Sequence, residues 1–373
     1  MNMQDLPFDA DAALERLRGW VEIESPTFDS AAVNKAMDRA ADDLASIGGR
    51  TARIPGTMGY GDCVVAQFGA TGPGILVMGH LDTVHPVGTL EVLPFAIKDG
   101  RCSGPGILDM KGGCVAALEA IASLSRVGRK TPLPVTVLLT SDEEVGSPST
   151  RGLIEDMASR NKYVLVPEPA LGAGGLVTGR YAISRYRLAA RGRPSHAGQA
   201  LKDGRSAISL MARKIIEIEA LTTEDYTFSV GTIHGGQWVN CVPTLCNAEA
   251  LSMAKRQADL DLAEQKLMAL AFDEGGPSFG VEPSVARPVW EPSPETLKLY
   301  ELARGIALEL GQAIDHGSDG GGSDANFTGH AGIPTLDGLG LTGRGLHTLE
   351  EYIEIDSLEK RTRLIAGLLM RLQ

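Results

Sequence analysis

The chain of 373 residues carries the stretch ILVMGHLD at residues 75–82. Its first four residues form a continuous apolar run, which is typical of a strand in a sheet that is covered on both faces. Runs of strand length recur at residues 62–68, 135–140 and 163–166, and helical spacing occurs at 110–124 and 151–159. Because strands alternate with helices, we predict an α/β fold with a mostly parallel sheet flanked by helices.

The pattern changes near Thr178. Apolar and polar residues alternate at 182–191, 226–233 and 245–253, and helical spacing occurs at 206–220 and 260–272. Alternation of this kind predicts a smaller α+β domain whose sheet has one solvated face. The proline-rich stretch Pro283–Pro294 is interpreted as the linker back to the first domain. We therefore predict one domain built from residues 1–177 and 286–373, with the second domain, residues 178–285, inserted into it.

Composition excludes several classes of partner. The 35 basic and 47 acidic residues give a net charge of −12, which disfavours nucleic acid and anionic membranes as partners. The first twenty residues contain four acids and no apolar core, unlike a secretory signal, and no apolar run approaches the ~20 residues of a membrane span. The five cysteines include no C-x-x-C pair and are interpreted as buried thiols. These features predict a cytoplasmic protein.

Polar residues follow the predicted strands directly. His80 and Asp82 come after the first run, and such a pair can supply a metal ligand with a carboxylate that fixes its tautomer, or it can be structural. Asp109 stands where a loop enters a helix, so it can be a helix N-cap or a carboxylate that bridges two cations. Carboxyl ends of strands in open α/β sheets meet at the ligand crevice.

More acidic residues follow the later strands. Residues 142–144 read Asp-Glu-Glu, and three adjacent acids repel one another unless a cation or proton intervenes or the loop is solvated. Glu168 ends the strand at 163–166, and His347 lies far along the chain. Together with His80 and Asp109, this inventory of imidazoles and carboxylates suits a pair of divalent ions that clamp a water molecule and a polarised carbonyl.

The chain resembles the dinuclear zinc amidohydrolases in seven short strings. These strings occur in the same order as in that family and run from about Trp20 to the C-terminus, nearly the whole chain. That family includes bacterial glutamate carboxypeptidase (carboxypeptidase G), acetylornithine deacetylase, succinyl-diaminopimelate desuccinylase and the aminoacylases. The strings are residues 79–84, 106–113, 140–146, 168–169, 194–198, 320–327 and 347–352. The resemblance implies a zinc-exopeptidase-like catalytic domain with an inserted lid or dimerisation domain, and two divalent ions, zinc with cobalt or manganese as alternatives.

The resemblance also implies a role for each metal-competent residue. His80 and Glu168 would complete one metal site, Glu144 and His347 would complete the other, and Asp109 would bridge the two ions. These five residues supply the imidazole and carboxylate ligands that zinc accepts.

Four further residues take roles by the same resemblance. Asp82 would orient His80, and Glu143 would act as general base and then general acid. His196 would reach the site of a partner subunit and stabilise the tetrahedral oxyanion, although it could equally be a surface loop residue. Asn240 would contact the substrate. The implied assembly is a homodimer formed through the inserted domain.

One departure concerns the substrate. Relatives of the carboxypeptidase type carry an arginine for the substrate carboxylate, and Met253 stands at that position here. Lys255, Arg256 or Arg344 would then supply the cation, or the substrate is not an ordinary acyl-glutamate. We predict a hydrolase that cleaves the C–N amide bond of a small carboxylate-bearing molecule, such as an N-acyl amino acid or a dipeptide. The alternatives are a deacylase or amidohydrolase acting on a non-standard small molecule and a non-catalytic metal-binding or scaffold protein.

Overall fold

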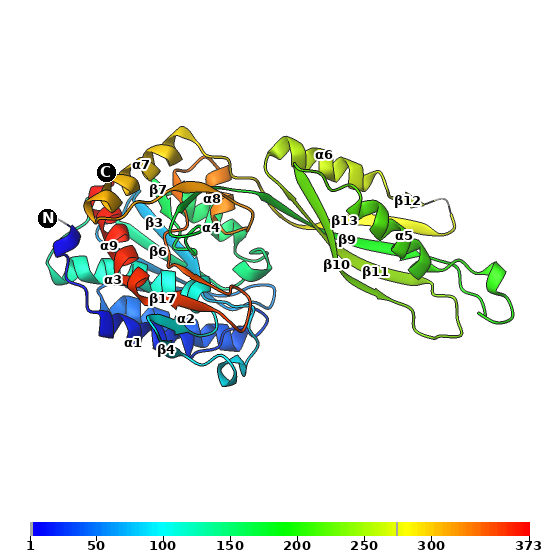
Figure 1. Ribbon diagram of the computed structural model, residues 1–373, viewed down its shortest axis with the longest axis horizontal. Helices are drawn as coiled ribbons and strands as arrows, with labels where there is room; N and C mark the ends of the chain where they lie inside the picture. The colour runs from blue at the N-terminus through cyan, green and yellow to red at the C-terminus, as the bar shows by residue number, and fades with distance from the viewer. Residues whose placement is uncertain (1–2, 274) are drawn as a thin grey trace. The chain divides into compact units, whose positions relative to one another are not determined.

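The computed structural model describes residues 3–273 and 275–373 and divides into two compact units (Figure 1). Unit 1 comprises the chain up to Gly179 together with Glu291–Asp319 and Ser323–Gln373. Unit 2 comprises Arg180–Trp290 and Gly320–Gly322. The second unit is therefore formed mainly by one continuous segment within the chain of the first.

Unit 1 contains alternating helices and strands. Its α-helices are α1 (Ala10–Val21), α2 (Ser30–Ser46), α3 (Gly112–Arg126), α4 (Arg151–Ser159), α7 (Pro294–Glu309), α8 (Ala325–His330) and α9 (Ile355–Arg371). Its longer strands are β1 (Arg50–Ile54), β2 (Cys63–Phe68), β3 (Ile75–His80), β6 (Val135–Thr140) and β8 (Leu176–Arg180), the last of which ends in unit 2. The shorter ones are β4 (Ala96–Lys98), β5 (Arg101–Ser103), β7 (Tyr163–Leu165), β14 (His316–Asp319), β15 (Thr335–Leu336), β16 (Gly343–Arg344) and β17 (Tyr352–Glu354).

The main sheet has the strand order β1-β2-β6-β3-β7-β15. β3 pairs in parallel with β6 and β7, and β7 pairs in parallel with β15. β1 and β2 run antiparallel to their neighbours. All six residues of β3 are buried, as the apolar run predicts. The mixed α/β fold with a mainly parallel sheet is thus confirmed, whereas β1 was not predicted because its residues are mostly exposed.

Helices cover this sheet, and several begin at a residue that the sequence marks. The Asp9 and Asp29 side chains accept hydrogen bonds from the first turns of α1 and α2, and Ser293 does the same for α7. α3 packs against β3, α1 and α9, and α4 packs against α8. α9 and α4 lie on opposite sides of β3 and β6 (Figure 1). A second, smaller sheet has the order β16-β17-β5-β4.

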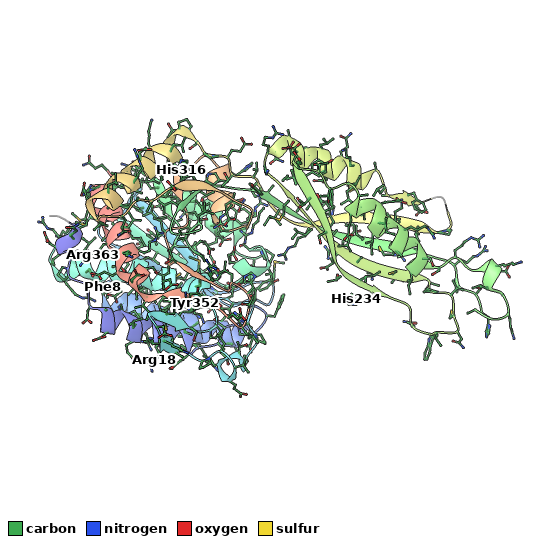
Figure 2. All side chains as sticks on the ribbon, viewed as in Figure 1. Phe8, Arg18, His234, His316, Tyr352 and Arg363 are labelled. Atoms are coloured by element: carbon green, nitrogen blue, oxygen red, sulfur yellow. The ribbon has the colours of Figure 1, made fainter. Side chains whose placement is uncertain are left out.

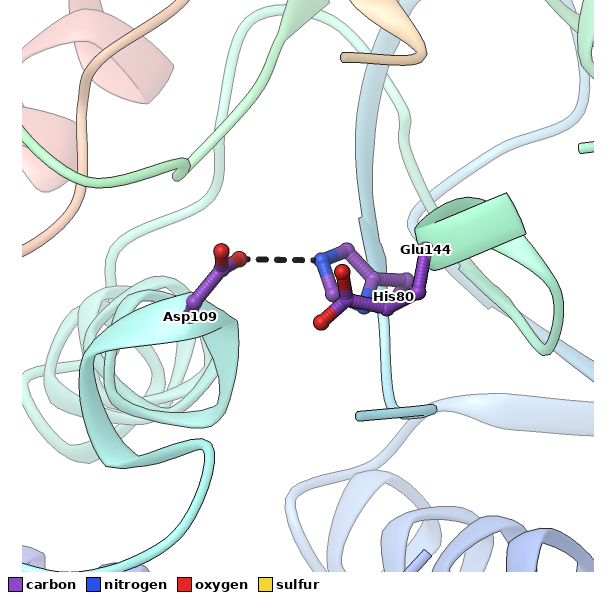
Figure 3. Close-up of side chains that lie close together, drawn as sticks. All are labelled: His80, Asp109 and Glu144. Carbon is purple, nitrogen blue, oxygen red and sulfur yellow. Dashed lines mark hydrogen bonds and ion pairs between the residues drawn. The ribbon is translucent and has the colours of Figure 1, made fainter. Parts of the chain in front are cut away.

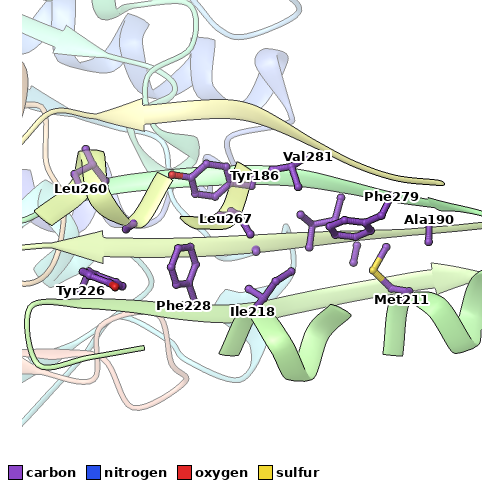
Figure 4. Packing of buried hydrophobic residues seen from close by; sticks show 14 of the residues in the cluster. Tyr186, Ala190, Met211, Ile218, Tyr226, Phe228, Leu260, Leu267, Phe279 and Val281 are labelled. Atoms are coloured by element: carbon purple, nitrogen blue, oxygen red, sulfur yellow. The ribbon is translucent and has the colours of Figure 1, made fainter. Parts of the chain in front are cut away.

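Unit 2 is an antiparallel sheet with two helices on one face. The strands β9 (Ala182–Arg191), β10 (Tyr226–Gly235), β11 (Leu245–Ala254), β12 (Phe272–Asp273) and β13 (Ser278–Arg287) are ordered β10-β11-β9-β13-β12. The helices are α5 (Ala207–Glu219) and α6 (Gln257–Met268). Alternate residues of the strands, such as Tyr186 and Leu188, join Met211 and Leu267 in one apolar core (Figure 4).

The interpretation of Pro283–Pro294 as a linker is wrong for its first part. β13 continues to Arg287, and Pro283 pairs with Tyr186 of β9. The register shifts between Pro283 and Ala286, so the proline lies at an irregular point of the ladder. Proline is tolerated in strands at such irregularities because the missing N–H interrupts no regular bond.

Among residues 3–273 and 275–373, no helix is both long enough and apolar enough to cross a membrane.

Candidate metal centre

His80 is the last residue of β3 and is buried. Its Nδ1 lies 2.9 Å from the backbone oxygen of Asp82. A carbonyl oxygen only accepts, so Nδ1 carries the hydrogen and Nε2 is left as the ligating nitrogen. Nε2 lies 3.2 Å from Oδ1 of Asp109, and Glu144 lies close to both residues (Figure 3).

The Asp82 carboxylate holds the loop that follows β6. It accepts hydrogen bonds from the backbone N–H of Glu143 at 3.2 Å and of Glu144 at 3.3 Å. Thr27 Oγ1 donates to it at 2.8 Å. Its Oδ1 is 3.4 Å from Nδ1 of His80, farther than its own backbone oxygen. The Asp82 carboxylate therefore contacts four neighbours, of which His80 is one.

Asp109 lies in the irregular turn Ile107–Lys111, before α3. The N-cap position of α3 is Lys111, so the interpretation of Asp109 as a helix cap is wrong. Instead, Oδ1 of Asp109 faces Nε2 of His80, and Oδ2 lies 3.2 Å from Nε2 of His347. Each carboxylate oxygen thus faces a different imidazole, which is the arrangement that a carboxylate bridging two cations requires.

Three glutamates complete the cluster. Oε2 of Glu144 lies 3.1 Å from Nε2 of His347. Oε1 of Glu168 and Oε2 of Glu143 lie 3.8 Å and 3.9 Å from Nε2 of His80. Glu143 and Glu168 are buried, so the alternative of a solvated acidic loop is wrong for residue 143.

Opposite charges and burial shift the pKa values of these groups. Hydrogen bonds to Asp109 and Glu144 raise the pKa of His347 to about 10. Burial alone would lower the pKa of His80, but hydrogen bonds to Asp109 and Asp82 outweigh it and raise that pKa well above its usual value. Burial, reinforced by Asp109, also raises the pKa of Glu168. Without a bound cation, the raised pKa values therefore favour protons on these groups, which offset the negative charge of the crowded carboxylates.

The donor set fits divalent ions. Two groups of three side chains have ligand atoms within 4.8 Å of one another: His80, Asp109 and Glu144, and His80, Glu143 and Glu168. Imidazole and carboxylate ligands suit zinc and, with less selectivity, cobalt and manganese.

Two residues with predicted roles lie in unit 2. His196 is exposed, and its Nδ1 accepts hydrogen bonds from the backbone N–H of Gly198 and Gln199 at 3.1 Å and 3.2 Å. Nε2 must then carry the hydrogen, so it is available as a donor. Asn240 lies beside this loop, since its backbone oxygen accepts from Ala197 N–H at 3.0 Å.

The candidate cations differ in their partners. Arg256 is bound to Asp259 through two hydrogen bonds of 2.7 Å and 3.0 Å, so its guanidinium is already engaged. Lys255 lies over the ring of Tyr181. Arg344 is exposed on β16 and, within the described part of the chain, pairs with no carboxylate.

Sequence reasoning assigned no role to Thr27, His85 or Glu351. His85 and Glu351 are buried, and Nε2 of the one lies 2.9 Å from Oε2 of the other. Their separation in the chain, 266 residues, gives no local signal that they meet. Of the histidines outside any motif, His316 packs on the Tyr300 ring, whereas His234 is exposed (Figure 2).

Comparisons with known proteins agree on one family. A profile of the Peptidase family M20/M25/M40 matches residues 76–371. Carboxypeptidase G2 of Pseudomonas sp. is 30% identical over 372 residues, covering 97% of this chain and 89% of its own length. Succinyl-diaminopimelate desuccinylase of Gluconacetobacter diazotrophicus is 28% identical over 328 residues, covering 82% of this chain and 83% of its own length.

A solved structure shares the fold. The crystal structure of a tripeptidase from Staphylococcus aureus matches with a TM-score of 0.80 at 20% identity, covering 97% of this chain and 98% of that one. The profile spans well over half of the chain, and the sequence relatives extend the match to nearly all of it. The chain therefore belongs to the peptidase family M20/M25/M40 and is a metal-dependent hydrolase of amide bonds.

Proposed function

We propose that the chain binds two divalent ions, most simply zinc, and hydrolyses a C–N amide bond of a small molecule. The observation that carries this proposal is Asp109, whose two oxygens face the ligating nitrogens of two different imidazoles. His80 and Glu168 would hold one ion with Asp109, and Glu144 and His347 would hold the other. When bound, the ions polarise a substrate carbonyl and lower the pKa of water toward 7.

Glu143 is the general base and general acid of this proposal. Its carboxylate is buried and lies 3.9 Å from Nε2 of His80, beside the ligand cluster. The backbone N–H of Glu143 donates to the Asp82 carboxylate, and this hydrogen bond fixes the position of the Glu143 backbone. Glu143 takes the proton from the attacking water and passes it to the leaving nitrogen.

His196 and Asn240 would act on the substrate from unit 2. The Nε2–H of His196 is free of the backbone bonds that Nδ1 makes, so it can donate to an oxyanion. Asn240 lies next to that loop and would contact the substrate.

The substrate is proposed to carry a carboxylate, as in an N-acyl amino acid or a dipeptide. Because Arg256 is engaged by Asp259, Arg344 is the better candidate to bind that carboxylate. Arg344 lies three residues before His347 in the sequence. The alternative is a deacylase or amidohydrolase that acts on a non-standard molecule without such a carboxylate, as Met253 at the usual arginine position suggests.

We further propose a homodimer formed through unit 2. β10 is an edge strand, and its outer side has no partner strand in the described part of the chain. Exposed apolar side chains accompany it, with Ile233 on β10 and Ile208 and Ile216 on α5. An unpaired edge beside an apolar patch is typical of a surface that another copy covers.

The five cysteines are unpaired in the structure, which supports the proposal of a cytoplasmic location.

Chelation tests the proposal. Treating the protein with a chelator should abolish hydrolysis of N-acyl amino acids or dipeptides, and adding Zn²⁺, Co²⁺ or Mn²⁺ should restore it. Full activity in a sample shown to be metal-free would contradict the proposal. A panel of N-acyl amino acids, dipeptides and neutral aromatic amides separates the two substrate classes. Turnover confined to the neutral amides would favour the alternative.

A further inference from the structure

One buried carboxylate gathers the loops of the candidate metal centre. Glu351 is 1% exposed and accepts backbone hydrogen bonds from Gly106 at 2.9 Å, Leu108 at 2.8 Å and Asp109 at 3.1 Å. A fourth bond comes from Nε2 of His85 at 2.9 Å. Since three N–H donors already face the carboxylate, it acts as an acceptor and Nε2 of His85 carries the hydrogen.

These bonds join segments that are far apart in the sequence. Gly106, Leu108 and Asp109 form the turn that presents the Asp109 carboxylate. His85 follows β3, the strand that ends in His80. Glu351 itself immediately precedes β17 and lies four residues after His347. One side chain therefore connects the turn of Asp109, the end of β3 and the loop of His347.

The His347 loop depends on such an anchor. The His347 side chain is 53% exposed, and its backbone has a φ of +60°, which few residues other than glycine adopt. The loop is closed by Thr348, whose N–H donates to Gly345 O at 3.0 Å. The buried end of the loop is Glu351, so its contacts fix where the exposed imidazole can lie.

We propose that Glu351, held by His85, is a positioning residue that fixes Asp109 against His347 and thereby sets the affinity for divalent ions. The inference rests on the proposed function, since it assumes that Asp109 and His347 bind the same ion. Some residues bind a metal ligand and fix its orientation without contacting the metal. Substituting such a residue typically weakens metal binding by about 10- to 100-fold.

The substitution Glu351→Gln isolates this role. Glutamine has the same shape as glutamate, but an NH₂ group replaces one of the two carboxylate oxygens. That NH₂ group would face backbone N–H donors that now find an acceptor. The adjacent Glu350 provides a matched control, because it is exposed and its side chain accepts none of these bonds. Glu350→Gln makes the same chemical change without touching the buried network.

The experiment is a titration of the metal-free 373-residue chain with Co²⁺, monitored by calorimetry and visible absorption. We expect Glu351→Gln to bind Co²⁺ about 10- to 100-fold more weakly and to give an altered absorption spectrum, with Glu350→Gln unchanged. Circular dichroism of the metal-free variants establishes that they are folded. A folded Glu351→Gln variant with the affinity and spectrum of the starting protein would overturn the inference.

A milder variant decides the matter if Glu351→Gln does not fold. His85→Phe keeps an aromatic ring and removes one of the four donors, so Co²⁺ affinity should fall by about 10-fold, at the low end of the range for such partners. Unchanged affinity in that variant would overturn the inference. If the unsubstituted chain itself binds no Co²⁺, the proposed dinuclear centre fails, and that result differs from a failure of Glu351 alone.

Discussion

Asp82 contacts His80 more closely through its backbone than through its carboxylate, at 2.9 Å against 3.4 Å. The spacing of the two residues predicts an orienting carboxylate, but it does not show what else that carboxylate binds. In the structure it accepts the N–H groups of Glu143 and Glu144. One side chain thus positions the proposed base and a proposed ligand, because the ends of β3 and β6 are adjacent in the sheet.

Glu143→Gln should separate metal binding from hydrolysis. The amide retains the shape of the side chain but cannot take up a proton, so kcat should fall at least about 10²-fold while bound metal stays near its original content. Steady-state kinetics and elemental analysis of the same sample measure both. Glu155→Gln on the exposed face of α4 is the control and should behave as the starting protein. An unchanged kcat in Glu143→Gln would remove its proposed role.

Arg344→Gln tests the source of the substrate cation. If Arg344 binds the carboxylate, KM for an N-acyl amino acid should rise at least about 10-fold, since a charged hydrogen bond contributes about 1.5–3 kcal/mol. KM for the corresponding amide, which lacks the carboxylate, should change little. Arg256→Gln serves as the comparison, because its guanidinium is bound to Asp259. Equal effects of the two substitutions on both substrates would count against Arg344.

At the scale of elements, the approach of α3 to the end of β7 brings Asp109 and Glu168 into one cluster. A Cβ atom on Gly113 would lie 1.8 Å from the backbone oxygen of Pro167, the residue before Glu168. Glycine is thus required at this point of α3 by a close approach of two backbones. The sequence shows a glycine near the start of a helix, but it does not show that this glycine packs against the backbone of Pro167.

Replacing a glycine in a helix with alanine usually stabilises the protein. Gly113→Ala should instead destabilise it, because the added Cβ would collide with the backbone of Pro167. We expect a loss on the order of 1–3 kcal/mol in the free energy of unfolding. Gly305→Ala in α7 is the matched control, because its Cβ would meet no atom of the described residues within 4 Å. This substitution should be neutral or stabilising by up to about 1 kcal/mol. Urea denaturation of both variants provides the measurement. A stabilised Gly113→Ala variant would contradict the close approach.

The buried thiol of β5 should make stability depend on pH. Burial raises the pKa of Cys102 to about 12. An unfolded thiol ionises near 8.5, so between these values the unfolded chain releases a proton that the folded chain retains. The contribution of Cys102 to stability is therefore complete below about pH 8.5 and is lost as the pH rises above it.

Cys102→Ala removes this dependence at one position. The difference in unfolding free energy between the starting protein and Cys102→Ala should shrink by up to about 1.4 kcal/mol for each pH unit above the unfolded pKa. Urea denaturation of both proteins at pH 8 and pH 10 measures it. A difference that is the same at both pH values would show that the thiol ionises equally in both states.

At the scale of the whole molecule, the proposed dimer can be tested on α5. Ile216 is 71% exposed on this helix, and Ile216→Glu should convert the dimer to a monomer, because a charge would be buried in an apolar contact. Sedimentation velocity gives the assembly state. Leu308→Glu in α7 is the control, since that leucine is 59% exposed but lies in unit 1. A monomeric starting protein would exclude the dimer outright.

Complementation tests whether His196 acts across such a dimer. His196→Ala and Glu143→Gln should each be nearly inactive alone. If His196 serves the partner's site, mixed dimers contain one intact site, so mixing the two variants after dissociation should restore up to about a quarter of the activity. If His196 acts within its own chain, every site in the mixture retains a defect and no activity returns.

Local pattern was sufficient for much of the fold and for the residue types of the candidate site. The apolar run at residues 75–78 predicts the buried strand β3, because a strand covered on both faces has no polar side. Alternation predicts the two-faced sheet of unit 2 for the same reason. Histidine and acidic residues at strand ends identify candidate ligands, since these side chains have the chemistry that metals need.

Only the tertiary structure decided which atoms meet. It places the two oxygens of Asp109 against His80 and His347, and it brings Glu351 to three backbone N–H groups that lie more than 240 residues earlier in the chain. It also continues β13 through Pro283, where the proline alone favoured a linker. Composition and periodicity act over a few residues, whereas these contacts depend on how distant segments pack. The sequence by itself therefore determined the buried strands of the main sheet, the alternating strands of unit 2 and the chemical groups of the site, whereas packing decided which groups meet.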